Sequence, residues 1–253
     1  MIEIKGLKKS FGPKEVLKGV DLTIPKGKTT VILGLSGGGK STIIKHIVGL
    51  LKPDEGEIWI DGEEISRADE EQIRAIRKKV GFLFQSGALF DSMNVYENVA
   101  FPLREHTAMK EEEIRDRVVE CLEMVALKPK EVIGLYPDEL SGGMRKRVGL
   151  ARTIALGPQI LLYDEPTSGL DPITSDLISQ MIIHLKKTLG VTSVLISHDI
   201  KESFKAGDYF AMLYDGKIIE FGDAEHFKST TNPYVRQFLD GRSEGPIKFQ
   251  DKQ

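Results

Sequence analysis

The sequence predicts an α/β protein with a mixed β-sheet core, an N-terminal antiparallel β-subdomain and an inserted α-helical lobe. Three observations predict this fold. Short strand-like segments fill residues 1–35, a helical pattern without strand-like alternation fills residues 96–156, and strands alternate with helices again from residue 160. Because such alternation is typical of a parallel sheet covered by helices, we expect a helix-covered sheet at the centre of the molecule.

The first third of the chain is expected to contain strands and helices in turn. Three strands are expected in residues 1–35, over Ile2–Leu7, Val16–Ile24 and the apolar run Thr29–Leu33, which stops at Gly34. The apolar spacing of residues 43–50 predicts a helix over Lys40–Leu50. The elements expected next are a hairpin over Glu57–Ile65, a helix over Glu70–Lys78 and a strand over Val80–Phe84.

The helical lobe is expected at about residues 87–157, inserted into a single domain that covers residues 1–240. The apolar face of its clearest helix consists of Ile114, Val118, Cys121, Leu122 and Val125. The elements expected after the lobe are strands over Ile160–Tyr163 and Thr192–Ser197, helices over Pro172–Leu189, Ile200–Lys205 and Pro233–Leu239, and a hairpin over Tyr209–Phe221. Residues 241–253 are expected to form a polar tail that contacts a dimer mate or another partner.

Composition excludes several classes of protein. The 253 residues are 40% hydrophobic and 29% charged, and 35 Lys and Arg against 38 Asp and Glu give a formal charge of −3. This balance excludes a disordered chain and a chain built to coat nucleic acid. The single cysteine, Cys121, excludes an internal disulfide and a cysteine-based zinc site. The apolar runs are far shorter than the roughly 20 residues of a membrane span, and the N-terminus lacks a secretion signal, so we expect a cytoplasmic protein.

A phosphate-binding pattern follows the third expected strand. Residues 34–41 fit Gly-x-x-x-x-Gly-Lys-Ser/Thr and stand between an expected strand and an expected helix, which is the setting this P-loop motif requires. The residues expected to bind a nucleoside triphosphate here are Gly34, Leu35, Ser36, Gly37, Gly38, Gly39, Lys40, Ser41 and Thr42. The glycines let backbone N–H groups face phosphate oxygens, Lys40 reaches the β- and γ-phosphates, and Ser41 is a ligand of Mg²⁺. The alternative is a glycine-rich tight turn.

Two adjacent carboxylates end another expected strand. Asp164 and Glu165 follow the apolar run Ile160–Tyr163, at the sheet edge where parallel sheets bind ligands. We expect Asp164 to hold Mg²⁺, directly or through water, and Glu165 to polarise the water that attacks the γ-phosphate. The alternative is a helix N-terminus that favours an Asp-Glu-Pro sequence in its first turn.

Two more polar residues follow expected strands. His198 follows Thr192–Ser197 and is expected to hydrogen-bond the γ-phosphate. Gln85 follows Val80–Phe84. Its amide oxygen is a candidate ligand for Mg²⁺ or a candidate hydrogen-bond acceptor that holds the attacking water. Taken alone, Gln85 also fits an ordinary loop residue.

A second glycine motif lacks a lysine. Ser141, Gly142 and Gly143 open an expected helix that runs to Leu156, so Ser141 is a natural N-cap and the glycines leave the first N–H groups uncovered. This pattern indicates a second anion site. The alternative, a plain helix start, gives little reason for two glycines, each of which costs about 1 kcal/mol in a helix.

Taken in order, these motifs resemble those of ABC-transporter ATPases. The motifs are Phe11, the P-loop, Gln85, the signature Leu140–Met144, Asp164 with Glu165, the run Ser168–Asp171, and His198. The resemblance covers nearly the whole chain. The signature departs from the commonest form at Met144, where glutamine is usual, and this change leaves Ser141 and the glycines intact.

The resemblance implies a P-loop NTPase of the ABC type that acts as a head-to-tail homodimer. Two ATP molecules would be held between the copies, each by the Lys40 loop of one copy and the Ser141–Gly143 turn of the other. It further implies that Phe11 stacks on adenine, that Asp171 bridges the copies and that Gln85 links ATP to a membrane partner through the lobe. For Phe11, the alternative is an aromatic side chain in a small core.

Two segments resemble a narrower group, the ATPases of Mla- and Mce-type lipid transporters. They are Gln85–Met93 and Gln237–Gly241, the latter followed by Gly245 and Pro246. This resemblance implies phospholipid trafficking between bacterial membranes, at the cytoplasmic face of the inner membrane. The implied partners are an integral-membrane permease, an Mce-domain substrate-binding protein and a STAS-type regulator, with no nucleic acid.

The helix expected at Pro233–Leu239 would expose an apolar face if it stood alone. That face consists of Tyr234, Val235, Phe238 and Leu239. We expect it to pack on the neighbouring ATPase subunit or on a small regulatory protein, and the alternative is packing on its own domain.

Three rival functions stay open at this point. An ABC importer or exporter for another substrate would need the same nucleotide residues. A non-transport ABC switch usually carries two cassettes or long coiled coils, and this sequence shows neither. A kinase or other P-loop enzyme would explain the glycine loop but leave Ser141–Gly143 without a role.

Overall fold

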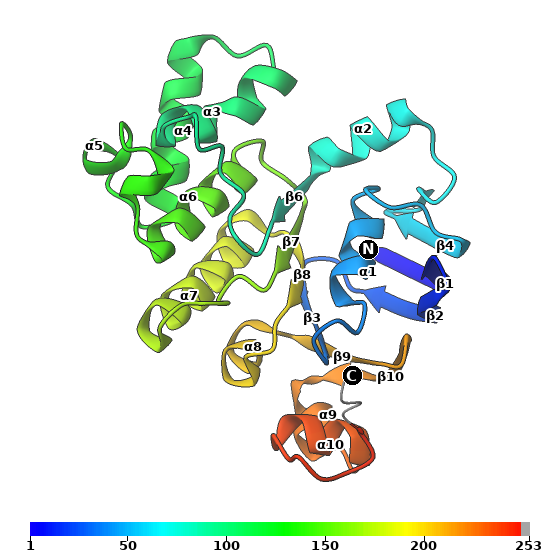
Figure 1. Ribbon diagram of the computed structural model, residues 1–253. Helices are drawn as coiled ribbons and strands as arrows, with labels where there is room; N and C mark the ends of the chain where they lie inside the picture. Colours follow the sequence, from blue (N-terminus) through cyan, green and yellow to red (C-terminus); the bar gives the residue numbers. More distant parts are fainter. Residues whose placement is uncertain (249–253) are drawn as a thin grey trace.

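The computed structural model describes residues 1–248, and two sheets form its framework (Figure 1). The smaller sheet is antiparallel, with the strand order β2-β1-β4-β5. Its strands are β1 (Ile2–Phe11), β2 (Lys14–Ile24), β4 (Glu55–Ile60) and β5 (Glu63–Glu64). Ile2, Ile4 and Leu7 of β1 are buried. The predicted N-terminal antiparallel subdomain is therefore confirmed.

The larger sheet is mixed, with the order β10-β9-β3-β8-β7-β6. Its strands are β3 (Thr29–Gly34), β6 (Val80–Leu83), β7 (Ile160–Asp164), β8 (Thr192–Ile196), β9 (Tyr209–Tyr214) and β10 (Lys217–Asp223). Neighbours from β9 to β6 run parallel, and β10 pairs antiparallel with β9. The carboxyl ends of the parallel strands therefore share one edge, where ligands of such sheets bind.

The mixed sheet lies between two hydrophobic cores. Successive side chains of a strand point to opposite faces, so Ile32 of β3 joins the core with α1 and the antiparallel sheet, whereas Val31 and Leu33 join the core with the helical lobe. Both faces of β7 and β8 are buried. This explains why those strands are continuous apolar runs in the sequence.

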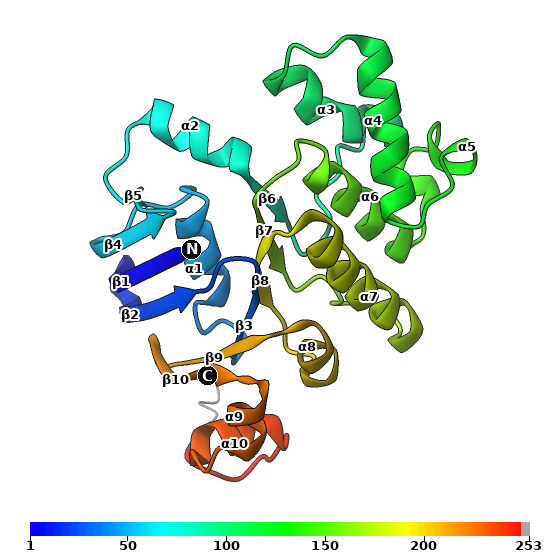
Figure 2. The ribbon, with the colours of Figure 1, turned by 180° about the vertical axis from the view of Figure 1, so that it is seen from behind.

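Helices between β6 and β7 form the lobe at the top of Figure 1. They are α3 (Val95–His106), α4 (Glu111–Met124), α5 (Pro129–Val132), the 3-10 helix η1 (Pro137–Glu139) and α6 (Gly142–Ile154). Ile114, Val118, Cys121, Leu122 and Val125 are all buried, as their spacing predicts. From behind, α6 lies beside α7 on one side of the mixed sheet, with the antiparallel sheet on the other (Figure 2).

The other helices follow the predicted order with small shifts. They are α1 (Lys40–Ile47), α2 (Glu70–Lys79), α7 (Pro172–Leu189), α8 (Ile200–Ala206), α9 (Ala224–Ser229) and α10 (Pro233–Leu239). Helix α1 ends before Leu50 because the chain turns at Gly49, whose φ is +68°. The sequence did not predict α9, whose six residues are too few to show a helical period.

Helix α10 packs on its own domain. Val235 is fully buried, and the ring of Tyr234 lies 4.9 Å from that of Tyr214 on β9. The apolar face of α10 was expected to pack either on another protein or on its own domain. For Val235 the structure shows packing on its own domain. The expected tail, residues 241–253, is described only as far as Lys248, so residues 249–253 lie outside the described residues.

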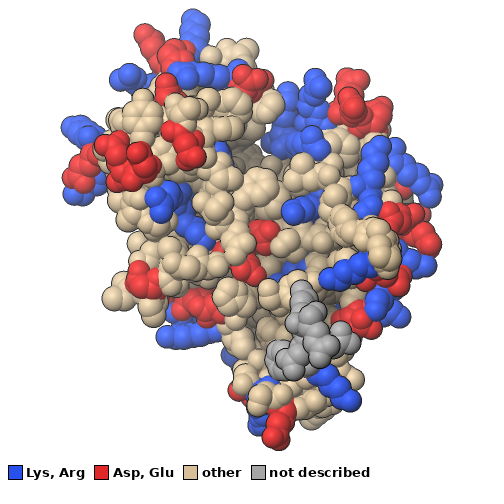
Figure 3. All heavy atoms as spheres, viewed as in Figure 1, with Lys and Arg blue, Asp and Glu red and all other residues tan. Residues whose placement is uncertain are grey.

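Charges of both signs are interspersed around the face shown in Figure 3, whose middle is mostly uncharged. This agrees with the nearly balanced composition. Within residues 1–248, none of the helices combines the length and apolarity needed to cross a bilayer.

Candidate functional site

The glycine loop connects β3 to α1, as its motif requires. Gly34, Gly37 and Gly39 have φ values of +149°, +73° and +101°, a region that side-chain-bearing residues rarely adopt. A Cβ at Gly34 would lie 2.4 Å from the carbonyl oxygen of Leu213, and one at Gly39 would lie 2.9 Å from a methyl carbon of Leu17. Glycine is therefore required at both positions by neighbours from β9 and β2.

A cavity of about 400 Å³ opens over this loop. Its lining residues are Phe11, Lys14, Val16, Ser36, Gly37, Gly39, Lys40, Ser41, Thr42, Gln85 and Glu165. The structure thus brings nine of the residues predicted for nucleotide binding or catalysis around one space.

Lys40 is the buried cation of this cavity. Its Nζ donates hydrogen bonds to the carbonyl oxygens of Gly34 and Leu35, both at 2.9 Å. Burial lowers the pKa of Lys40, against the attraction of Glu165 and Asp164. Among the described residues, the acceptors of the amine are these carbonyl oxygens, so an anionic phosphate offers it a stronger, charge-assisted bond.

Ser41 and Asp164 meet directly, although 123 positions separate them. The Ser41 hydroxyl donates to Oδ1 of Asp164 at 2.9 Å. Burial raises the pKa of Asp164, and the bond from Ser41 opposes that rise. Asp164 is the last residue of β7, and α7 begins only at Pro172. The alternative that Asp164 and Glu165 sit in the first turn of a helix is therefore wrong.

Glu165 lies between the predicted polar residues from the neighbouring strands. Its Oε2 accepts a bond from Nε2 of Gln85 at 3.1 Å and lies 3.5 Å from Nδ1 of His198. Gln85 also donates to Oγ of Ser168 at 3.3 Å. Because β6, β7 and β8 are parallel neighbours, the residues that follow them meet at one edge.

Phe11 ends β1 at the rim of the cavity. It is 47% exposed, and Nζ of Lys9 lies 5.8 Å from its ring centroid. An exposed ring is not part of a small core, so the structure contradicts the alternative considered for Phe11. The exposed part of the ring can stack on a planar base.

The signature turn, which opens α6, lines a neighbouring cavity through Gly142, together with Gln85 and Asp164. Ser141 is the N-cap and accepts a bond from the N–H of Met144 at 3.2 Å, as predicted. Ser141 and Gly142 are exposed, whereas Gly143 is buried against Thr174 of α7. Among described residues, none of Ser141–Gly143 lines the cavity over Lys40. Within one chain the two glycine motifs therefore do not form one site.

Asp171 has a local structural task. It caps α7, accepting bonds from the N–H groups of Ile173 and Thr174, each at 3.0 Å. The Thr174 hydroxyl also donates to it, and these bonds lower the pKa of Asp171.

Comparison with known proteins identifies the family. Residues 17–168 match the family model described as ABC transporter. The chain belongs to the ABC transporter family. It is 42% identical to the intermembrane phospholipid transport system ATP-binding protein MlaF of Escherichia coli K12, over 99% of this chain and 92% of the relative. It is 46% identical to the probable ribonucleotide transport ATP-binding protein mkl of Mycobacterium leprae, over 99% of this chain and 72% of the relative.

A similar solved structure indicates ATP hydrolysis. A dimeric, post-hydrolysis state of the ATP-binding cassette MJ0796, bound to ADP and Pi, superposes with a TM-score of 0.81 at 36% identity, covering 88% of this chain and 98% of that one. This ABC transporter subunit is thus a P-loop ATPase. The family and its fold confirm the predicted fold class and disfavour the kinase.

The site of this ABC ATPase also fits a magnesium ion. No group of three or more His, Cys, Asp or Glu side chains gathers within residues 1–248 to hold a metal. Mg²⁺ at nucleotide sites needs only one or two carboxylates and takes its other ligands from phosphate and water. The Ser41 hydroxyl beside the buried Asp164 carboxylate offers that donor set.

Sequence reasoning missed Lys146 of α6. This residue is only 6% exposed, and its Nζ donates to the carbonyl oxygens of Ser168, at 3.0 Å, and Glu165, at 3.4 Å. The sequence spacing could have indicated that Lys146 is buried, because it places Lys146 on the same helix face as Gly143, Gly149 and Leu150, which are all buried. A lysine on a buried helix face needs a polar partner.

Proposed function

We propose that this chain hydrolyses ATP to drive phospholipid trafficking between bacterial membranes through an Mla/Mce-type permease. The observation that carries the proposal is the 42% identity to MlaF across nearly the full length of both chains. The subunit would act at the cytoplasmic face of the inner membrane. Its partners would be the permease, an Mce-domain substrate-binding protein and a STAS-type regulator.

A second candidate substrate is a ribonucleotide. It is favoured by the 46% identity to mkl, whose name assigns it to ribonucleotide transport. The ATP site would be the same for both, because the permease and its binding protein select the transported molecule.

The working unit we propose is a head-to-tail homodimer. Each ATP would lie between the Lys40 loop of one copy and the Ser141–Gly143 turn of the other. The exposure of Ser141 and its absence from the described lining of the Lys40 cavity support this arrangement, because they leave an anion-binding helix start accessible to a ligand held by another copy. The dimeric MJ0796 structures support it as well.

The residues that meet near the start of α1 would bind the phosphates and Mg²⁺. Lys40 would exchange its two carbonyl acceptors for β- and γ-phosphate oxygens. Mg²⁺, when bound, would neutralise phosphate charge, held by Ser41, Asp164 and the amide oxygen of Gln85. The backbone N–H groups of the loop would hold the phosphates in place.

The catalytic end would consist of the cluster around Glu165. Glu165 would take the proton of the attacking water as general base. Gln85, already bonded to Glu165, would orient that water, and His198 would donate a hydrogen bond to the γ-phosphate. Phe11 would stack on adenine and Asp171 would contact the second copy.

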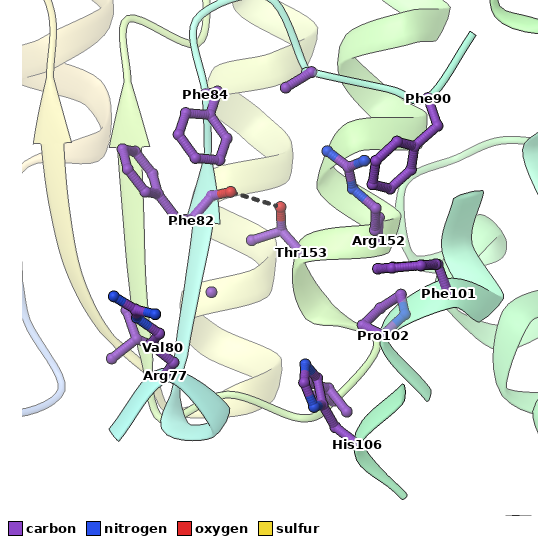
Figure 4. Close-up of a pocket in the computed structure, with 13 residues that line it drawn as sticks. Arg77, Val80, Phe82, Phe84, Phe90, Phe101, Pro102, His106, Arg152 and Thr153 are labelled. Atoms are coloured by element: carbon purple, nitrogen blue, oxygen red, sulfur yellow. Dashed lines mark hydrogen bonds between the residues drawn. The ribbon is translucent and has the colours of Figure 1, made fainter. Parts of the chain in front are cut away.

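The permease contact we propose is a groove of about 330 Å³ between the lobe and the mixed sheet (Figure 4). Phe84, Phe90, Phe101 and Pro102 line it, together with the cation of Arg152. The Arg152 guanidinium lies 5.6 Å from the Phe90 ring and donates to the carbonyl of Gly87 at 2.8 Å. Gly87 is two residues from Gln85, which contacts Glu165. A permease segment bound in this groove would therefore move Gln85.

The test is to capture the membrane complex through a tag on this subunit and identify what it carries. We expect a multi-span permease and bound phospholipid in lipid extracts, and ATP-dependent loss of that lipid to acceptor vesicles. The Glu165→Gln complex is the matched control, since it should keep the lipid. A complex that transfers ribonucleotides and no lipid would support the second candidate instead.

A further inference from the structure

Lys146 connects the signature helix to the turn that carries the catalytic acid. It lies one helical turn after Gly142, at which α6 begins. Its hydrogen-bond acceptors among the described residues are the carbonyl oxygens of Glu165 and Ser168, which begin and end the turn 165–168. We call this segment the acid turn. Both acceptors are backbone atoms, so the lysine restrains the course of the chain.

Glu165 needs such a restraint. Its φ is +48°, in the left-handed region, which costs a non-glycine residue roughly 1–3 kcal/mol and persists only where its surroundings impose it. The N–H of Glu165 donates to Ile196 of β8 at 2.9 Å, and its carbonyl accepts from the N–H of Ser168 at 3.1 Å. Lys146 adds a third fixed contact, and the only one from the helical lobe among these.

Burying the amine of Lys146 costs free energy, because its charged form loses contact with water. Burial lowers the pKa of Lys146, while the charge of Glu165 opposes this. Within residues 1–248 this amine is bonded to carbonyl oxygens alone, and the cost of burying it is offset only if those bonds have a role. An apolar side chain of similar length would fill the same space without that cost.

We propose that Lys146 is a positioning residue for hydrolysis, which fixes the acid turn so that the Glu165 carboxylate meets Gln85 and His198. This inference rests on the proposed role of Glu165 as general base. It assigns to the signature helix a task within its own chain, besides the contact proposed with the ATP of the second copy.

The test compares kcat and KM for ATP in three variants of the full chain. Lys146→Met keeps the buried stem and removes the donor, and we expect kcat to fall at least about ten-fold, with KM within two-fold, because misplacing a catalytic group slows the reaction more than binding. Lys146→Arg keeps a cationic donor, and the neighbouring cavity of about 600 Å³ that Lys146 lines has room for it. We expect it to recover at least half of the wild-type kcat.

Arg147→Met is the matched control. Arg147 lies on the same helix and donates to a backbone carbonyl, that of Ala126 at 3.1 Å, but this carbonyl belongs to the lobe. We expect its kcat to stay within two-fold of wild type. Thermal unfolding of each variant separates a folding defect from a slower reaction.

A further measurement removes any dependence on stability. In a Glu165→Gln background, adding Lys146→Met should lower the residual rate by less than two-fold, because the positioned carboxylate is already gone. The inference is overturned if Lys146→Met keeps the wild-type kcat, or if Arg147→Met lowers kcat as much as Lys146→Met does. It is also overturned if Lys146→Met lowers kcat by the same factor in the Glu165→Gln background as in the wild-type chain. Absence of ATPase activity in the wild-type chain would instead count against the proposed function.

Discussion

The two glycine-rich turns of this chain differ in how much of a phosphate site each one completes. Both precede a helix, α1 or α6, and both place backbone N–H groups at a helix start. The loop before α1 is packed against β2 and β9, leads directly into the buried Lys40 and lies beside Asp164 at the end of β7. The turn before α6 is exposed at Ser141 and Gly142 and has no lysine.

The difference shows that a helix N-terminus becomes a reaction site only through what its neighbours supply. Parallel strands deliver Asp164, Glu165, His198 and Gln85 to the edge at which the first loop lies. The signature turn itself carries no acid or base. Gly142 shares a cavity of about 600 Å³ with Gln85 and Asp164, and Ser141–Gly143 can therefore contribute binding but no catalytic group of their own. The proposed dimer brings the two unequal halves together, and four changes test that comparison.

The largest effect is expected for Glu165→Gln on the catalytic side. Losing the general base should lower kcat by roughly 10²–10⁴-fold, while ATP still binds and the dimer accumulates with ATP bound. Phosphate release and light scattering measure the two outcomes. Glu225→Gln, an exposed residue of α9, is the control. A monomer that keeps wild-type turnover would refute the split site.

Lys40→Ala should act on binding instead. Because the amine would bond phosphate directly, we expect the Kd for ATP to rise about 10- to 100-fold, measured by titration calorimetry in the Glu165→Gln background. Lys187→Ala removes an exposed cation from the last turn of α7 and should leave Kd unchanged. Equal Kd values for both variants would mean that Lys40 does not reach the phosphates.

Ser141→Ala should lower kcat about ten-fold through the loss of one phosphate donor, and destabilise α6 by ~1 kcal/mol through the lost cap. Mixing this variant with Lys40→Ala sharpens the comparison. Random pairing makes half of the dimers mixed, and each mixed dimer holds one intact composite site, so we expect about a quarter of the wild-type rate. If each chain carries its own complete site, mixing restores nothing.

The smallest effect is expected for Asp164→Asn on the stability of the nucleotide-free chain. Because burial raises the pKa of Asp164, its carboxyl favours folding below its unfolded pKa of about 3.9, and that contribution is lost as pH rises through the folded pKa. At pH 7 the neutral amide should therefore raise Tm by about 2 °C, while Mg²⁺-dependent hydrolysis is lost. The gain in Tm should vanish near pH 4, and a lower Tm at pH 7 would contradict this account.

Local sequence patterns were sufficient for most of the fold. Helix α7 begins and ends at the predicted residues because Asp171 caps its start and Gly190, with φ +64°, ends it. The runs that became β3, β7 and β8 were recognisable because buried parallel strands are apolar on both faces. Helix α9 was missed, since six residues carry too little periodicity.

The sequence by itself determined the chemistry at the strand ends, namely the glycine loop, the two acids, Gln85 and His198, and the chemistry of the signature turn at a helix start. Such motifs are local, and backbone geometry with residue type is enough to specify them. The tertiary structure alone decided which of them meet. Strand order placed Ser41 against Asp164 and Gln85 against Glu165, while it left Ser141 outside that cavity. Lys146 and the docking of α10 likewise depend on partners far apart in sequence, which periodicity does not encode.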